Sequence, residues 1–375
     1  MAEITVNAPC PPGPAPVREH AGPRGALPRA EPIEHAGDIR AAGLAGTTAV
    51  SVVIAAYQAE RFIGAALESI LRQSRKPLEL VVVDDGSTDR TAEVLAGFGG
   101  QLRVIRQENR GCPAAFNTAF QAATGTLIAM CGADDLWLPH KLEWQLAAAA
   151  SHPEVDVFFG HALLTGRVQG EHSRPPGSGV LDSRSFADRL YLECCVCAST
   201  VMMRKALYQR IGPFRERFGA DDHEYWFRAL RSGARFYYDP RPLAYWRQHD
   251  TNLTLQREWM ESSAREVRRW YAADVSARAR AEAAYMESRR LIDARAYGAA
   301  RPLLVRSVVE SMRRPSAIAL RALVWLAIAF LPSSTSARAA RGAASLRSLI
   351  RRRGLRPHRR RALRGGRWPH RRSAQ

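Results

Sequence analysis

The hydrophobic pattern divides the first part of the chain into short apolar runs separated by amphipathic segments. Four runs rich in apolar, mostly β-branched residues predict buried strands: 50–54, 78–83, 102–105 and 126–130. Three segments between them predict helices: 62–71, 91–95 and 113–123. Because strands alternate with helices, we expect right-handed βαβ units in an α/β fold, with a mixed, mostly parallel sheet flanked by helices.

The two ends of the chain have a different composition from this α/β region, which we place at 47–255. Residues 1–46 are rich in Pro, Gly and Ala without a period, so we expect them to be disordered. From residue 256 the composition favours helices, with one helix predicted over 302–312 and another over 315–331. We therefore expect a helical C-terminal extension at 256–331 and a basic, disordered tail at 332–375.

Charge is distributed unevenly along the 375 residues. The net charge is +19, but residues 331–375 alone contain 14 Arg and no acidic residue, so the rest of the chain carries 19 − 14 = +5. The main body is therefore not expected to bind nucleic acid specifically. The tail is either a solvated extension or, together with the apolar helix before it, a contact for an anionic membrane surface.

Cysteine usage and hydropathy bear on the compartment. The six cysteines show no paired framework, and Cys194 and Cys197 form a C-x-x-C motif inside an apolar segment, which favours core thiols in a reducing compartment. No secretory signal is evident near the first residue. The longest apolar stretch, Ala317–Leu331, has 15 residues, fewer than the ~20 that span a bilayer. We expect a cytoplasmic protein, either soluble or peripheral on the cytoplasmic face of the membrane.

Polar residues gather where the predicted strands end. Tyr57 follows the first strand, the pair Asp84-Asp85 follows the second, and the pair Asp134-Asp135 follows the fourth. Ligands of open α/β sheets bind beyond the carboxyl ends of the strands. One acid there is often a helix cap, but two acidic pairs at one edge repel each other unless a cation or ligand compensates.

These motifs, in this order, resemble those of the family 2 inverting glycosyltransferases, which have the GT-A fold. The resemblance covers about residues 49–255, so the α/β region is interpreted as the catalytic domain. Beyond the two acidic pairs it includes the following landmarks: Val50–Tyr57, Val81–Asp89, Asn109–Gly111, Ala123–Gly125, Ala133–Pro139, Gly212–Phe214, Asp221–Arg228 and Trp246–His249.

The resemblance implies a nucleotide-sugar donor lying across the first strands. Carried over by position, Ala55 and Tyr57 would border the base, and Asp85 would hydrogen-bond it, as in relatives that use a uridine donor. Asn117 and Arg247 are implied as further contacts, with Arg247 close to the diphosphate. Each of these last two assignments is unspecific by itself.

The resemblance also implies a divalent metal, Mn²⁺ or Mg²⁺. Asp135 would be its main ligand, Asp134 would approach the metal and the ribose, and His249 would meet the metal or the diphosphate. Carboxylate oxygens suit such hard cations, whereas a solvated loop histidine is an equally good explanation of His249. Many relatives have an Asp where this chain has Gly132, so the acidic cluster has one carboxylate fewer.

An inverting transfer needs a base that removes the proton of the acceptor hydroxyl. Asp221 and Asp222 resemble the acidic pair that supplies it. Alignment on Trp226 and Arg228 makes Asp222 the base and Asp221 the supporting acid. The alternative is that one of these two acids only caps the helix that follows.

The sequence thus favours an inverting, metal-dependent glycosyltransferase, with a glycan, a lipid-linked molecule or another hydroxyl compound as acceptor, in bacterial cell-surface glycan biosynthesis. A nucleotidyltransferase would need a phosphate loop rich in Gly and Lys after the first strand. The segment there, Ala55–Ile63, contains no Gly and no Lys. A third hypothesis is a membrane-tethered, non-catalytic binder of nucleotide sugars, which Gly132 alone supports.

Overall fold

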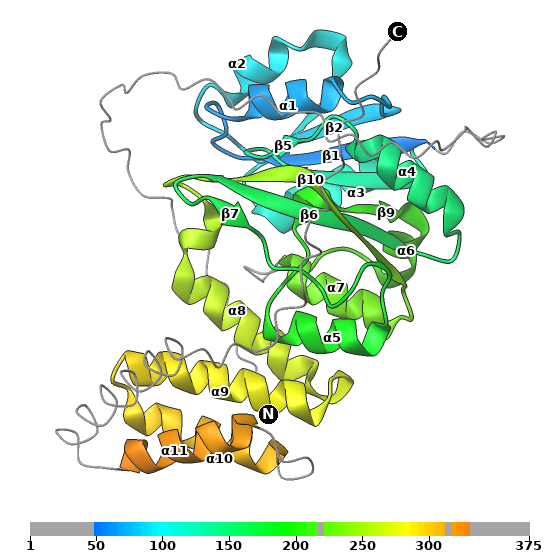
Figure 1. The fold of residues 1–375 in the computed structure, drawn as a ribbon. Helices are drawn as coiled ribbons and strands as arrows, with labels where there is room; N and C mark the ends of the chain where they lie inside the picture. The colour runs from blue at the N-terminus through cyan, green and yellow to red at the C-terminus, as the bar shows by residue number, and fades with distance from the viewer. Residues whose placement is uncertain (1–48, 217–220, 312–316, 331–375) are drawn as a thin grey trace, which may run out of the picture. The chain divides into compact units, whose positions relative to one another are not determined.

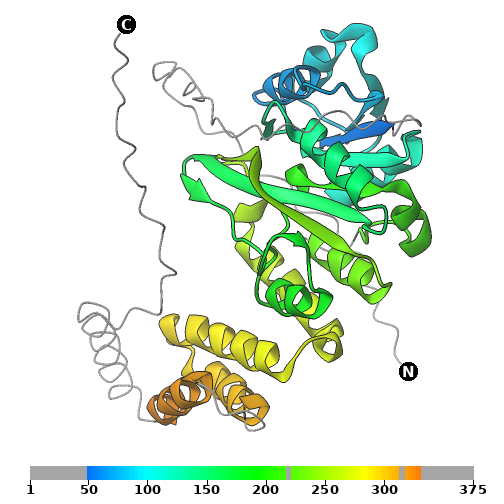
Figure 2. The ribbon, with the colours of Figure 1, turned by 45° about the vertical axis from the view of Figure 1, so that its right-hand side comes forward.

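The structure, a computed structural model, describes residues 49–216, 221–311 and 317–330. The chain forms two compact units that divide between Ala279 and Arg280 (Figures 1 and 2). The segments predicted to be disordered, 1–46 and 332–375, lie outside the described residues.

The first unit is built on one sheet. Its strands, in the order in which they lie side by side, are β3 (Arg103–Arg106), β2 (Glu79–Asp84), β1 (Val50–Ala56), β4 (Leu127–Gly132), β9 (Met202–Arg204), β6 (Val157–Gly166), β10 (Phe236–Gln248) and β5 (Leu136–Trp137). Within this order β9 and β5 run against the other strands. Two short strands, β7 (Gly170–Glu171) and β8 (Gly179–Val180), pair with β6 and β10. The predicted mixed, mostly parallel sheet is confirmed.

Helices cover both faces of this sheet (Figure 1). They are α1 (Ile63–Leu71), α2 (Thr91–Ala96), α3 (Cys112–Ala122), α4 (Lys141–Ser151), α5 (Ser183–Leu192), α6 (Lys205–Ile211), α7 (Asp221–Arg231) and α8 (Arg257–Trp270), with 3₁₀ turns η1 (Gly99–Gln101), η2 (Ala198–Thr200), η3 (Leu253–Leu255) and η4 (Ala272–Asp274). Helices α1, α2 and α4 bury their apolar faces in one core with alternate residues of β1, β2 and β4. Helix α3 contacts β1 and β2.

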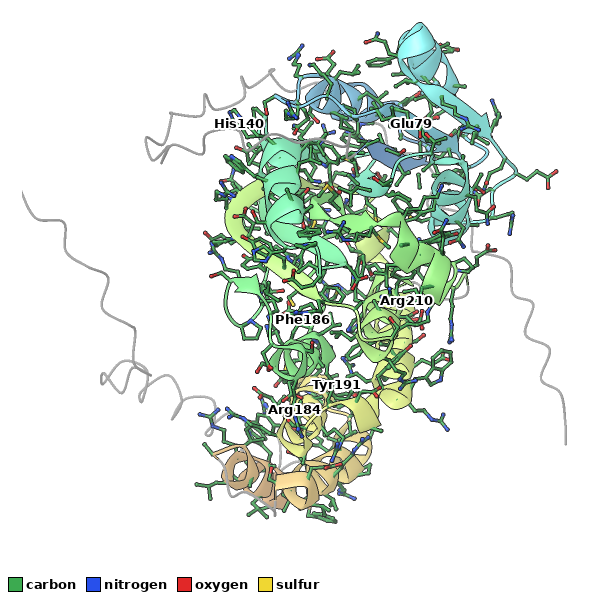
Figure 3. All side chains as sticks on the ribbon, turned by 90° about the vertical axis from the view of Figure 1, so that its right-hand side faces the viewer. Glu79, His140, Arg184, Phe186, Tyr191 and Arg210 are labelled. Atoms are coloured by element: carbon green, nitrogen blue, oxygen red, sulfur yellow. The ribbon has the colours of Figure 1, made fainter. Side chains whose placement is uncertain are left out.

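Aromatic side chains join α5 to the sheet and to α7. Phe186 stacks on Phe159 of β6 with a centroid distance of 5.8 Å, and Tyr191 meets the ring of Phe227 edge-on at 6.4 Å (Figure 3 labels Phe186 and Tyr191). Aromatic pairs in these geometries contribute beyond the area they bury. Helix α7 is therefore connected to the sheet through α5.

The first helix of the C-terminal region, α8, begins at Arg257, close to where the sequence predicts it, but it belongs to the first compact unit. We expected the catalytic domain to end at residue 255, but the two units divide after Ala279. The reason is that the segment around α8 packs on α7: the Tyr271 hydroxyl donates to Glu224 at 2.7 Å, and Arg231 donates to the Trp270 carbonyl at 3.2 Å. The region 256–279 therefore belongs to the first unit.

The second unit contains α9, whose range Ala277–Asp293 crosses the division, followed by α10 (Tyr297–Ser311) and α11 (Ala317–Phe330). A helical C-terminal region is thus confirmed. The expectation that a helix begins at Pro302 is wrong, because Pro302 lies inside α10. The buried side chains of Ala300 and Leu304, on either side of it, pack with α11 and offset the missing backbone hydrogen bond.

One buried cation lies within the first unit. The Lys141 ammonium, on α4, donates to Gln145 Oε1 at 2.8 Å and lies 3.9 Å from the centre of the Trp137 ring. Burial lowers the pKa of Lys141 from its ordinary 10.5 to about 7. The unfolded chain therefore binds an additional proton between these two values, and this proton opposes folding.

We predict that Lys141→Met flattens the pH dependence of stability. In the wild-type protein, the contribution of Lys141 makes the free energy of unfolding rise as pH increases from about 7 toward 10.5. Methionine retains much of the side-chain volume and does not titrate. Urea unfolding of both proteins across this window measures the difference in slope. Parallel curves for the two proteins would show that Lys141 remains protonated in the folded state.

Candidate active site

The ends of β1, β2 and β4 meet where the sequence placed its polar residues. Ala55 of β1 pairs with Val83 of β2 on one side and with Gly132 of β4 on the other. Tyr57 follows β1 and is about half exposed. The structure therefore brings the first strand end next to the segment that carries Asp134, as expected for one crevice at the edge of a sheet.

Asp134 forms a close pair with His249. Its Oδ2 lies 3.0 Å from His249 Nε2 and also accepts from Asn252 Nδ2 at 3.2 Å. The His249 ring is stacked on Phe62, with the ring centres 4.3 Å apart. On its other edge, Nδ1 lies 2.9 Å from Thr251 Oγ1. The imidazole is thus fixed in position, with Nε2 directed at a carboxylate oxygen.

The Asp135 carboxylate is buried and serves as an anchor. Its Oδ2 accepts from the Ser199 hydroxyl, and its Oδ1 accepts from the backbone N–H of Arg247 at 3.0 Å. Ser199 Oγ in turn accepts from the Gly132 N–H at 2.8 Å. Burial, followed by the charge of Asp134, raises the pKa of Asp135 to about 7. Asp135 therefore connects the ends of β4 and β10 to the η2 turn before β9.

Gly132 is the position at which many relatives have an additional acid. A Cβ atom there would lie 2.8 Å from Asp134 Oδ1 and 3.0 Å from Asp135 Oδ2. The two existing carboxylates thus occupy the space that a side chain at residue 132 would enter. Across the described ranges, no group of three or more His, Cys, Asp or Glu side chains is arranged to hold a metal ion.

The residues present nevertheless fit a divalent metal in part. The Asp134 carboxylate is partly exposed, whereas both oxygens of Asp135 already accept hydrogen bonds within the protein. A carboxylate oxygen suits Mg²⁺ and Mn²⁺, and an imidazole nitrogen is more typical of transition metals, so Asp134 with His249 favours Mn²⁺. The backbone N–H of Thr251 donates to His249 Nδ1 at 3.3 Å, so a metal at Nε2 would require the ring proton to move to Nδ1.

Three other predicted donor contacts have partners within the protein. Asp85 is buried and accepts from Gln107 Nε2 at 2.7 Å and from the backbone N–H groups of Arg110 and Gly111 at 3.0 and 2.8 Å. The carboxylate of Asp85 therefore shapes the loop between β3 and α3. That loop lies beside the strand ends where the base was expected.

Asn117 and Arg247 also connect separate segments. The Asn117 side chain donates to the Phe214 carbonyl at 2.9 Å and accepts from the Phe214 N–H at 2.8 Å, so it joins α3 to the segment before α7. The Arg247 guanidinium donates to the carbonyls of Asp134 and Phe62. In this structure both side chains hold the walls of the site.

The candidate base lies at the start of α7. Burial raises the pKa of Asp222 to about 6, and Oδ1 of Asp222 accepts from the His223 N–H at 2.7 Å. The side chain of the supporting acid, Asp221, is outside what the structure describes. Burial also raises the pKa of the Cys197 thiol, and the charges of Asp135 and Asp222 both add to that rise. Asp135 and Asp222 therefore both lie near the Cys197 thiol.

Buried contacts fix the orientation of α7. The side chain of Glu224 is fully buried and accepts from Arg228 at 3.2 Å, as well as from Tyr271. His223 is buried, its Nε2 lies 2.7 Å from the Leu190 carbonyl oxygen, and burial lowers its pKa to about 4. His223 is thus neutral at physiological pH, and α7 holds Asp222 rigidly.

Sequence reasoning missed Ser199 and Asn252. Ser199 lies in an apolar segment that reads as buried core, and the polar pair Ser199-Thr200 within it was the available signal. Asn252 follows His249 by three residues in a polar stretch. Both residues act through partners more than 60 positions away, a relation that local patterns do not reveal.

We predict that Ser199→Ala destabilises the protein by about 1–3 kcal/mol, because the Gly132 N–H and the Asp135 carboxylate both lose a buried partner. The hydroxyl stabilises the ionised form of Asp135, so the loss should be larger above pH 7 than below it. Urea unfolding at two pH values measures both effects. Ser232→Ala, at an exposed helix end, serves as control, and an equally small change in both variants would contradict the role of Ser199.

Comparisons with known proteins agree with this arrangement. The family model described as glycosyl transferase family 2 matches residues 51–212. The putative glycosyltransferase EpsE of Bacillus subtilis is 30% identical over 196 residues, which cover 50% of this chain and 69% of that protein. An uncharacterized glycosyltransferase of Rickettsia typhi is 28% identical over 214 residues, covering 55% of this chain and 65% of that protein. The chain thus spans just under two thirds of that relative's length.

One further relative and one solved structure complete the comparison. An Escherichia coli protein named UDP-Glc:alpha-D-GlcNAc-diphosphoundecaprenol beta-1,3-glucosyltransferase WfgD is 28% identical over 185 residues, covering 48% of this chain and 70% of that protein. The structure of Staphylococcus aureus TarS 1–349 with UDP-GlcNAc has 19% identity and a TM-score of 0.49, covering 76% and 82% of the two chains. That likeness carries no argument about ligands. The sequence relatives establish that this chain belongs to glycosyltransferase family 2, with its glycosyltransferase domain in residues 51–212.

Proposed function

We propose that the protein is an inverting, divalent-metal-dependent glycosyltransferase that moves a sugar from a UDP-linked donor to a hydroxyl acceptor in bacterial glycan biosynthesis. The acceptor would be a glycan or a lipid-linked molecule. The names of two relatives support this class, since one is a putative glycosyltransferase and the other names a UDP-sugar donor and a diphosphoundecaprenol-linked acceptor.

The observation that carries the proposal is that the acidic pair and Asp222 both lie near Cys197, since the charges of Asp135 and Asp222 both act on its thiol. Asp134, paired with His249, and Asp222 are both partly buried, and burial raises the pKa of Asp222 to about 6. An acid of this kind is ionised at neutral pH and still accepts a proton readily. The two groups suit two different tasks in one transfer.

The acceptor oxygen forms a bond to the anomeric carbon while the bond from that carbon to the donor phosphate oxygen breaks, which inverts the configuration. The acceptor proton passes to the Asp222 carboxylate, and the nucleoside diphosphate leaves. Asp134 and His249 would hold the metal, which when bound neutralises charge on the diphosphate. Arg247 and Ser199 keep the acidic segment in place.

The primary test is incubation of the purified protein with Mn²⁺ and a panel of nucleotide sugars and hydroxyl acceptors. The proposal expects acceptor-dependent release of UDP and a β-linked product from an α-linked donor. Retention of configuration, or binding of UDP-sugars without transfer to any acceptor in the panel, would contradict it.

We predict that Asp222→Asn lowers the rate of transfer by about 10²–10⁴-fold, the usual contribution of a general base. Asparagine has nearly the same shape but cannot take the proton. Donor affinity should remain close to wild type, because Asp222 is assigned to the acceptor. In the wild-type protein the rate should fall as pH drops through about 6, where Asp222 becomes protonated.

Asp221→Asn is the matched control, because it makes the same change one residue away. Replacing the supporting acid Asp221 should lower the rate of transfer less than replacing Asp222 does. A nearly normal rate for Asp222→Asn together with loss of activity in Asp221→Asn would move the base by one residue. Normal rates in both variants would leave this pair as a helix cap.

We predict that excess chelator abolishes transfer and that added Mn²⁺ restores it. Asp135→Asn should lower metal-dependent turnover about 10–100-fold, because Asp135 fixes the segment that carries Asp134. Asp182→Asn, which retains a good N-cap for α5, should leave turnover unchanged. Turnover that persists unchanged in chelator would exclude the metal assignment.

A further inference from the structure

Helix α11 is apolar on both of its sides. Its 14 residues include a single charged side chain, Arg321. One side buries Ala322, Trp325 and Ala329 in a small core with residues of α9 and α10. Burial of this side explains why the helix is folded, but it does not account for the apolar residues on the opposite side.

The opposite side of α11 exposes a stripe of large apolar residues. They recur at helical spacing, and their exposed fractions are 67% for Leu320, 48% for Leu323, 49% for Val324 and 63% for Phe330. On α10, Val305 and Val309 are exposed to a similar extent. A concentration of exposed apolar side chains of this size usually marks an interaction surface.

Side-chain contacts hold this stripe in place. The Arg301 guanidinium, on α10, donates from Nε and Nη2 to the carbonyl oxygen of Ala329 at 3.0 and 2.8 Å. The same guanidinium lies 4.6 Å from the centre of the Phe330 ring. Arg301 thereby satisfies a carbonyl near the C-terminus of α11 and fixes Phe330 while this ring remains exposed. The apolar stripe is therefore a feature of the folded unit.

The charge that follows the stripe indicates its partner. Residues 331–375, directly after Phe330, contain 14 Arg and no acid. An exposed apolar helix face next to concentrated positive charge matches the chemistry of a bilayer surface that contains anionic lipid. In the described part of the chain, none of the helices combines the length and the apolar character that crossing a bilayer requires. Contact with the surface is thus the relevant mode.

A second copy of the chain fits this surface less well. A symmetric dimer places the same patch of each subunit against the other. Two segments of 14 Arg each would then lie next to the same interface and repel each other. Anionic headgroups instead compensate the positive charge.

We propose that the apolar stripe of α11 attaches the protein to a membrane surface containing anionic lipid. The apolar side chains enter the boundary between headgroups and acyl chains, and the positive charge of the sequence that follows favours anionic headgroups. In the cell this would be the cytoplasmic face of a membrane. The inference does not depend on the proposed function, because attachment is measured without donor or acceptor.

The test is co-sedimentation of the full-length protein with vesicles of phosphatidylglycerol and phosphatidylcholine, compared with vesicles of phosphatidylcholine alone. We expect binding to the anionic vesicles at about 0.01 M ionic strength and weaker binding near 1 M, since the Debye length falls from ~30 to ~3 Å. No binding to anionic vesicles at low ionic strength would overturn the proposal.

The triple variant Leu320→Gln, Leu323→Gln and Val324→Gln tests the apolar stripe in the full-length chain. It should bind anionic vesicles about tenfold more weakly or worse, because three apolar side chains no longer enter the lipid. Leu78→Gln with Val104→Gln, at exposed apolar positions of the first unit, is the matched control and should bind like wild type. Glutamine favours helices, and circular dichroism checks that both proteins are folded.

Two results of this comparison would overturn the proposal. If the triple variant binds anionic vesicles with wild-type affinity, the apolar stripe does not contribute to attachment, and attraction by the arginines alone explains the binding. A wild-type dimer in sedimentation velocity that the triple variant loses, without vesicle binding by either protein, would make a second copy the partner.

Discussion

The candidate site depends on how two adjacent carboxylates are held at the end of one strand. Asp134 and Asp135 follow β4 directly, and burying such a pair is unfavourable unless each carboxylate finds donors. Asp135 accepts from Ser199 and from the backbone of Arg247, which belong to segments far along the chain. The acidic pair therefore determines how β4, η2 and β10 come together. Asp134 remains partly exposed.

The same constraint explains how the site accommodates Gly132. With no side chain at this position, the two carboxylates turn back over the strand end, and Ser199 bonds the glycine N–H. A third acid would have to enter space that the other two already fill. Beside this pair, Phe62 and Asn252 hold His249 against Asp134. Under the proposed function, Asp134 with His249 would be a different donor set from three carboxylates and would favour a transition metal over Mg²⁺.

Much of the fold could be predicted from the sequence, because each buried strand is a short run of apolar residues that can be recognised locally. The runs predicting β1, β2, β3 and β4 agree with the observed strands to within about two residues at each end. The strand pattern predicted the acids at the strand ends, and the resemblance to the family indicated Asp222 on α7. What could not be predicted depends on distant partners, such as Ser199, whose hydroxyl meets a carboxylate 64 positions earlier. The division of the two units after Ala279 was not predicted either, because the packing of α8 on α7 leaves no local signal.

Under the proposed function, Asp134 and His249 act together on a metal-bound diphosphate. A double-mutant cycle tests it directly, with UDP affinity measured by calorimetry in the presence and absence of Mn²⁺ for wild type, Asp134→Asn, His249→Gln and the double variant. If both residues hold one metal, each single change weakens Mn²⁺-dependent binding and the double change costs little more, which gives a coupling of about 1 kcal/mol or more. Strictly additive losses, or UDP affinity that does not respond to Mn²⁺ in the wild-type protein, would contradict the account.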